Sequence, residues 1–252
     1  MLGSKRVAPP SHPWQLKVAE SYVFPLDASK FDRARVDLHL TSDADQKDFL
    51  YSGFGAVMLV RYSDFPVGPY DELLLIPEAF EPKGTARKPF LADRLVTRIY
   101  SSKGGKIGES GLAKFTWSEE NYFHRRVTVS LKDSAGDKSE QKSIYEASFF
   151  RTPSFLPANT WPIPKPLMPS IVEKAIDEDG EELICPTNDN DFWLATKLDI
   201  TTGLLGVCFG LEMHFADDRH FPDLSKLGGI SRVGICGCGN MIFCSPTKID
   251  AP

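Results

Sequence analysis

One carboxylate stands at the start of an apolar run, in the kind of surroundings that acid-base chemistry requires. Glu72 precedes the run Leu73 to Ile76. Side chains alternate between the two faces of a strand, so Glu72, Leu74 and Ile76 would share one face. If this face lies inside an apolar barrel, burial raises the pKa of the carboxyl group, which can then move a proton near neutral pH. We predict that Glu72 is catalytic and that Leu74 lies beside it at the substrate. The alternative is a glutamate that stays solvated.

A cation stands in a second strand-like run, Leu95 to Ser101. Alternation places Val96, Arg98 and Tyr100 on the same side of this strand. A guanidinium group there can hold a carboxylate or an enolate oxygen through charge-assisted hydrogen bonds. We therefore predict Arg98 as the second catalytic residue. The alternative is that Arg98 pairs with an acidic residue of the neighbouring strand and only ties two strands together.

Arg61 and Tyr70 flank a turn that contains Pro66, Gly68 and Pro69. The phenol of Tyr70 can donate a hydrogen bond from an apolar wall. Both residues are included in the predicted substrate-binding set. The alternatives are a structural tyrosine packed under the turn and an arginine at the surface.

Strands must position these residues. Runs rich in β-branched and aromatic residues recur along the chain, each bounded by Gly, Pro, Asp or Asn. They predict strands within 21–24, 55–62, 72–76, 95–101, 113–117, 125–131, 143–150, 192–199, 206–214 and 232–243. Many short strands with regular turns predict a mainly β fold, either a sandwich or a barrel.

Helix signals are few. Residues 30–35 and 168–176 are predicted as short peripheral helices, the second with Pro169 in its first turn. The Pro-rich segment 152–169 and the acidic loop 177–182 give no strong domain boundary. A chain of 252 residues is long enough for a single β-barrel domain over 1–252.

Composition narrows the class of protein. The net charge of -5 excludes a general affinity for nucleic acid. Three prolines within residues 9–13 interrupt the apolar stretch that an export signal needs, and no apolar run is long enough to cross a membrane. We expect a cytoplasmic protein with no membrane partner and no cofactor, and we leave a homo-oligomer open.

The C-terminal quarter is rich in cysteine and glycine. Cys208, Cys236, Cys238 and Cys244 lack the spacing of a zinc site, so we predict small buried thiols and no metal. The glycines of the run 234–239 precede no amphipathic helix that could bind phosphate, and they are interpreted as bends in a closing hairpin.

A longer pattern resembles a known family. The segment 61–77, RYSDFPVGPYDELLLIP, is similar to the signature of acetoacetate decarboxylase-like proteins, particularly their fungal branch. Blocks at 13–17 (PWQLK), 97–100 (TRIY), 112–115 (LAKF) and 221–224 (FPDL) are similar in the same order. These blocks are spread along most of the chain, between residues 13 and 224.

The resemblance implies a closed, strongly bent antiparallel barrel whose interior holds a β-keto acid and a lysine that forms a Schiff base. Glu72 matches the active-site glutamate of the family, and the strand of Arg98 would line the pocket, with Val96 and Tyr100 contacting substrate. Lys17 lies near the place where bacterial members carry a substrate-binding arginine, and it completes the predicted substrate-binding set.

The chain departs from the family at the lysine. The segment between Tyr100 and Leu112 is short, and the Pro-Lys pair of the family aligns with Glu109 and Ser110. Serine cannot condense with a ketone, so the covalent route is closed at Ser110.

Three hypotheses remain. The first is an enzyme of secondary metabolism that uses Glu72 and Arg98 for non-covalent cyclisation, isomerisation or dehydration of a polyketide-like or terpenoid substrate. The second is a carrier of a small hydrophobic molecule with a carbonyl or carboxylate group. The third is a residual decarboxylase or aldolase with a displaced lysine, either Lys106 or Lys114. Alternation places Lys114 on the face opposite the apolar residues Ala113 and Phe115, so we expect its side chain to point to solvent.

Overall fold

The computed structural model describes residues 13–27, 49–51, 54–66, 68–76, 79–82, 93–94, 98–101, 109–119, 121, 123–131, 143–153, 156–157, 171–174, 192–196, 198–215, 229–245 and 247–250. Side chains are described for 13–27, 55–66, 68–75, 113–118, 121, 123–131, 143–153, 156–157, 199–215 and 229–245. For the other described residues, the structure gives the backbone and its strand pairing only.

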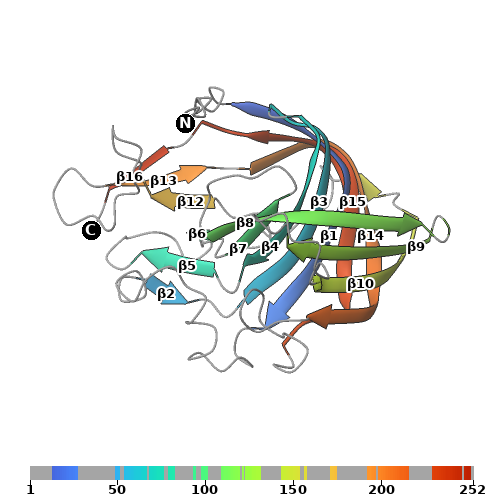
Figure 1. The fold of residues 1–252 in the computed structure, drawn as a ribbon. Helices are drawn as coiled ribbons and strands as arrows, with labels where there is room; N and C mark the ends of the chain where they lie inside the picture. Colours follow the sequence, from blue (N-terminus) through green and yellow to red (C-terminus); the bar gives the residue numbers. More distant parts are fainter. Residues whose placement is uncertain are drawn as a thin grey trace, which may run out of the picture.

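The larger sheet has the strand order β10-β9-β8-β7-β4-β3-β1-β15-β14-β11. Its strands are β1 (Trp14–Asp27), β3 (Phe54–Asp64), β4 (Tyr70–Ile76), β7 (Arg98–Ser101), β8 (Glu109–Glu119), β9 (His124–Leu131), β10 (Ser143–Arg151), β11 (Leu156–Pro157), β14 (Leu198–Phe215) and β15 (Val233–Phe243). Because β10 also pairs with β14, the sheet curls into a nearly closed barrel (Figure 1). Its described pairs are antiparallel except for β7 with β8.

The smaller sheet has the strand order β16-β13-β12-β6-β5-β2. Its strands are β2 (Phe49–Tyr51), β5 (Ala79–Pro82), β6 (Asp93–Arg94), β12 (Ile171–Lys174), β13 (Phe192–Thr196) and β16 (Thr247–Asp250). No helix among the described residues is long and apolar enough to cross a membrane.

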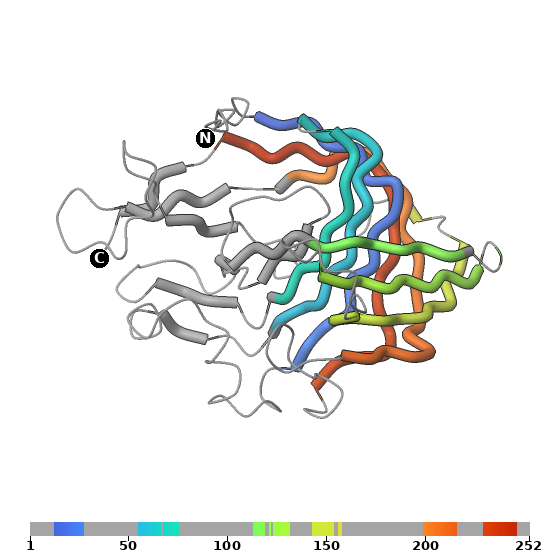
Figure 2. Tube along the Cα trace, viewed as in Figure 1, coloured from blue at the N-terminus to red at the C-terminus, as the bar shows by residue number. Residues whose placement is uncertain are grey.

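The barrel core is built from alternate residues of the strands around the sheet. Its fully buried side chains include Tyr22, Phe24, Leu59, Leu73 and Phe149. The rings of Tyr22 and Phe149 stack with their centroids 4.8 Å apart, which joins β1 to β10 across the interior. The long strands β3, β1, β15 and β14 lie side by side and bend together around this core (Figure 2).

A bulge in β1 switches the face of that strand. The register against β3 shifts between Val18 and Glu20. Leu16 and Val18 therefore belong to a second apolar cluster on the other face of the sheet, whereas Tyr22 and Phe24 belong to the barrel core. An extra residue in one strand reverses the alternation beyond it. β1 thus contributes side chains to both faces.

The glycines of β15 allow close approach of its neighbours. A Cβ atom on Gly237 would lie 2.6 Å from Cδ2 of Leu205 and 2.9 Å from the carbonyl oxygen of Leu204. β14 and β15 pair over most of their length, in agreement with the predicted closing hairpin.

The mainly β class is confirmed, and each predicted strand overlaps an observed one. The predicted helix over 168–176 is wrong where it is described, because Ile171–Lys174 forms β12. β12 pairs with β13, and this long-range pairing suits the β-branched residues Ile171 and Val172. The predicted helix over 30–35 lies outside the described residues.

Candidate functional site

The hairpin of β3 and β4 positions Glu72. Its turn carries a hydrogen bond from the N–H of Gly68 to the carbonyl of Phe65, and Gly68 has a φ of 85°, which favours glycine. The turn sets a register in which Tyr62 pairs with Tyr70 and Val60 pairs with Glu72. These four residues therefore share one face of the hairpin, called here the Glu72 face.

Among the described side chains, the Glu72 face is apolar apart from its hydroxyl and carboxyl groups. Leu16, Val18, Val60, Tyr62 and Leu74 form its buried cluster. Partly buried side chains pack around this cluster, including Trp14, Met58, Phe65, Tyr70, Met241 and Phe243. This face lies on the other side of the sheet from Leu73 and Leu75, which belong to the barrel core.

Two phenols hold the carboxyl group of Glu72. Tyr62 and Tyr70 both make side-chain hydrogen bonds to it. Their rings stack at 4.8 Å with an interplanar angle of 26°, and the ring of Phe65 packs edge-on against Tyr70 at 4.8 Å. The carboxyl group therefore has two donors whose rings are fixed by packing.

Burial raises the pKa of Glu72 from its ordinary value of 4.5 to about 7, although hydrogen bonds from Tyr70 and Tyr62 oppose the rise. The same burial, with the nearby carboxylate, raises the pKa of both phenols, so Tyr62 and Tyr70 stay protonated. A carboxyl group that is about half ionised near neutral pH can either accept or donate a proton. Among the residues considered from the sequence, Glu72 thus has the electrostatics of an acid-base group.

This pKa predicts a pH dependence of stability. Glu72 ionises near pH 4.5 in the unfolded chain and near pH 7 in the folded chain. The stabilisation that the folded state gains from protonated Glu72 is therefore fully present below pH 4.5 and is lost as the pH rises through 7. Glutamine is neutral throughout. We expect the free energy of unfolding of Glu72→Gln minus that of wild type to be about 3 kcal/mol larger at pH 8 than at pH 4. Urea unfolding at both pH values measures this change, and a difference independent of pH would contradict the raised pKa.

The other predicted residues of this hairpin divide between the two faces. Tyr70 and Leu74 lie on the Glu72 face, and Leu74 is buried. Arg61 lies on the opposite face, where its Nε is 3.6 Å from Oδ1 of Asp71 and its guanidinium lies 5.6 Å from the ring centre of Trp117. The structure therefore brings Tyr70 and Leu74 to Glu72 and directs Arg61 away from it.

Lys17 is exposed and alternates with the buried residues Leu16 and Val18. Since these two residues belong to the Glu72 face, the structure does not bring Lys17 to that face. Lys114 on β8 is also exposed, as its alternation with Ala113 and Phe115 predicted.

The backbone register locates Arg98 and Tyr100, whose side chains lie outside the described residues. β7 pairs with β4 so that Arg98 is opposite Leu75 and Ser101 is opposite Glu72. Leu75 lies on the other face of β4 from Glu72, so this register does not place Arg98 beside Glu72. Val96 lies outside the described residues, and a role for Arg98 and Tyr100 stays a prediction.

Ser110 can also be placed by register. It pairs with Ile99 of β7, which in turn pairs with Leu74 of β4. Ser110, the position that the resemblance assigned to the family's lysine, is therefore two strands away from Leu74 in the same line of paired residues, and Leu74 belongs to the Glu72 face. The side chain of Ser110 lies outside the described residues.

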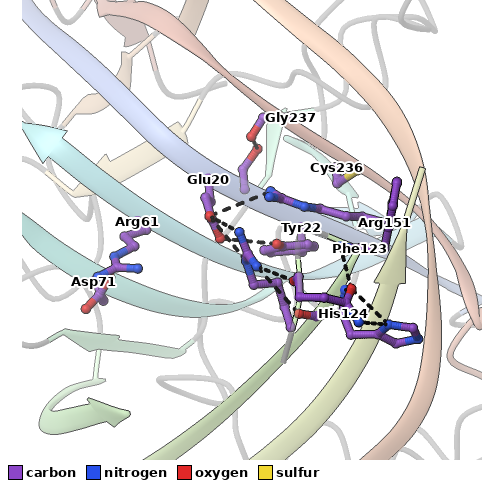
Figure 3. Close-up of polar contacts among 12 residues, drawn as sticks. Glu20, Tyr22, Arg61, Asp71, Phe123, His124, Arg151, Cys236 and Gly237 are labelled. Carbon is purple, nitrogen blue, oxygen red and sulfur yellow. Dashed lines mark hydrogen bonds and ion pairs between the residues drawn. The ribbon is translucent and has the colours of Figure 1, made fainter. Parts of the chain in front are cut away.

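A second group of polar side chains borders the barrel core. The Glu20 cluster consists of Glu20, Tyr22, Arg125 and Arg151 (Figure 3). The hydroxyl of Tyr22 donates to Oε2 of Glu20 at 3.2 Å, and Nε and Nη2 of Arg125 donate to Oε1 at 3.4 Å. Nη1 of Arg151 lies 3.6 Å from the same Oε1 atom.

The Glu20 cluster ties β1 to β9 and β10. Only 6% of the Arg125 side chain and 15% of the Glu20 and Arg151 side chains are exposed. Nη1 of Arg125 also donates to the carbonyl of Asn121 at 2.9 Å, which anchors the β8–β9 turn. Sequence reasoning missed this cluster. A signal was present in β9, where Arg125 alternates with the apolar residues Val127 and Val129.

Sequence reasoning also missed Tyr62. Its position two residues after Val60 was a signal, because alternation puts both on one face of β3. That Tyr62 lies close to Glu72 could be known only from the register of the hairpin.

Four cysteines have described side chains. Cys208 and Cys236 are buried, as predicted, whereas Cys238 is exposed and Cys244 is intermediate. The thiols of Cys208 and Cys236 interact, which together with burial raises the pKa of Cys208. Among the residues with described side chains, no group of three His, Cys, Asp or Glu side chains could hold a metal ion.

Comparison with solved structures identifies proteins of similar fold. No family model and no curated protein matches the sequence. Among solved structures, acetoacetate decarboxylase from Legionella pneumophila is 12% identical with a TM-score of 0.59, and the match covers 99% of this chain and 92% of that one. An acetoacetate decarboxylase-like enzyme from Sphingomonas wittichii RW1 is 9% identical with a TM-score of 0.57, and 99% of each chain is covered.

The enduracididine biosynthesis enzyme MppR is similar to the same extent. Its complex with the condensation product of pyruvate and imidazole 4-carboxaldehyde is 11% identical with a TM-score of 0.55, covering 98% of this chain and 93% of that one. At these identities the likeness shows the fold. The chain has the fold of acetoacetate decarboxylase and related enzymes.

Proposed function

We propose that this chain is an enzyme that uses Glu72 for non-covalent acid-base chemistry on a small hydrophobic carbonyl compound. The observation that carries the proposal is a carboxyl group with a pKa of about 7 on an apolar face. Such a group can exchange a proton with a carbonyl oxygen or with the carbon beside it. Cyclisation, isomerisation and dehydration each need a proton transfer of this kind.

The solved structures of the same fold support the proposal that this chain is an enzyme, since they include acetoacetate decarboxylase and the biosynthetic enzyme MppR. We place the reaction in secondary metabolism, with a polyketide-like or terpenoid substrate. The proposal does not include Arg98, because β7 pairs with β4 so that Arg98 is opposite Leu75, and Leu75 lies on the other face of the sheet from Glu72.

Product formation by Glu72→Gln tests the proposal. The amide keeps the size of the carboxyl group but cannot exchange a proton. If the folded variant binds the substrate and retains full turnover, the acid-base role is wrong, and a carrier or a template that acts by shape becomes the better interpretation.

The proposal predicts that acetoacetate forms no Schiff base with this protein. Ser110 stands where the resemblance placed the lysine, and Lys114, two residues beyond Leu112, is exposed. Borohydride reduction in the presence of acetoacetate should therefore leave the mass of the protein unchanged. Acetoacetate decarboxylase, treated in parallel, is the positive control. A reduced adduct mapped by peptide mass spectrometry to a lysine such as Lys106 would favour the residual decarboxylase hypothesis instead.

A further inference from the structure

Glu72 is one of three polar groups that two neighbouring strands bring together. Tyr70 lies two residues before it on β4, and Tyr62 lies opposite Tyr70 on β3. The side chain of Tyr62 is almost fully buried, whereas Tyr70 and Glu72 are partly exposed. The site therefore has a closed side, formed by Tyr62, and a more open side, formed by Tyr70 and Glu72.

The two phenol rings have little freedom to move. They stack on each other at 4.8 Å, and Phe65 packs edge-on against Tyr62 at 5.3 Å and against Tyr70 at 4.8 Å. A fourth aromatic ring, that of Trp14, has its centroid 5.6 Å from that of Phe65. Because these contacts fix the rings, they also fix the hydroxyl groups that reach Glu72.

A carboxyl group held by two fixed donors has a defined orientation. Hydrogen bonds to an ionised group are stronger than those between neutral groups, and each phenol favours the carboxylate form of Glu72. Without them, burial alone would favour the protonated form more strongly. The phenols thus control both where the carboxyl group lies and how readily it ionises.

We propose that Tyr62 and Tyr70 are positioning residues that together hold the carboxyl group of Glu72 for proton exchange with substrate. This inference rests on the proposed function of Glu72 and adds two residues to it. Tyr62 acts from the buried side and has no direct part in the chemistry. Tyr70 supports the carboxyl group from the open side.

Phenylalanine substitutions test the proposal, because they keep the ring packing and remove only the hydroxyl groups. Loss of a hydrogen bond to the charged form raises the pKa of a carboxyl group. We expect the pKa of Glu72 to rise by about one unit in Tyr62→Phe and again in Tyr70→Phe, with a larger rise in the double variant. Titration of 13C-labelled glutamate by NMR measures it without a substrate, and Glu72→Gln assigns the resonance.

Tyr22→Phe is the matched control. Tyr22 also donates its hydroxyl to a glutamate, Glu20, but on the opposite face of the sheet. This variant should leave the pKa of Glu72 unchanged. The limb of the pH-rate profile that reports Glu72 should move with its pKa in the Tyr62 and Tyr70 variants and stay in place in Tyr22→Phe.

If the pKa of Glu72 stays within about 0.3 units of wild type in both folded tyrosine variants, the positioning role is overturned. That result would leave the proposed function to be judged by the turnover of Glu72→Gln. Conversely, if the pKa shifts as expected but Glu72→Gln retains full turnover, the proposed function fails while the hydrogen-bonded arrangement of the three residues stands.

Discussion

Replacing Glu72 with glutamine is expected to lower turnover of the natural substrate about 100-fold or more, the typical loss when a general acid or base is removed. The amide can still accept a hydrogen bond from Tyr62 or Tyr70, so the packing of the Glu72 face should survive. What it cannot do is carry the proton. Since the carboxyl group has a pKa of about 7, the loss should be evident at neutral pH.

Turnover and substrate affinity must be measured separately in this variant. Acid-base catalysis predicts a lower kcat with a dissociation constant close to that of wild type. Glu146→Gln is the matched control, because Glu146 is exposed on β10, and it should keep wild-type turnover. A variant that binds substrate tenfold more weakly but turns over normally at saturation would assign Glu72 to binding.

The pH dependence shows which role Glu72 has. If it donates a proton in the slow step, turnover of the wild type falls as the pH rises through about 7. If it accepts one, turnover falls as the pH drops through the same value. Glu72→Gln should lose this limb of the profile in either case. A limb that persists unchanged would belong to another group.

Replacing Glu20 with glutamine is expected to destabilise the fold by about 3–5 kcal/mol, the range found when one partner of a buried ion pair is removed. The carboxylate of Glu20 contacts the guanidinium groups of Arg125 and Arg151 and the hydroxyl of Tyr22. Glutamine keeps the volume but removes the charge that both arginines contact. The loss should be large because Arg125 is almost fully buried.

Urea unfolding of Glu20→Gln and of Glu212→Gln measures this effect against a surface pair. Glu212 lies 3.9 Å from Arg126, but both side chains are more than half exposed, so its substitution should cost less than about 1 kcal/mol. Equal losses in the two variants would show that the Glu20 cluster contributes no more than a surface ion pair.

The sequence alone determined the class of fold and the face of the strand that Glu72 shares with Leu74. Alternating apolar and polar residues predict strands locally, because the side-chain period of two depends only on the backbone. The same alternation correctly placed Leu74 beside Glu72 and directed Lys114 to the surface. Helix prediction failed at Ile171–Lys174, where pairing with a distant strand decides the structure.

Tertiary structure decided the partners of each group. Tyr62 reaches Glu72 only through the register of the β3–β4 hairpin, and Glu20 meets Arg125 across 105 positions of sequence. The bulge in β1 gives Glu20 the same face as Tyr22, whereas Leu16 and Val18 join the Glu72 face. A bulge and a register arise from the pairing of whole strands, so no local pattern of residues specifies them.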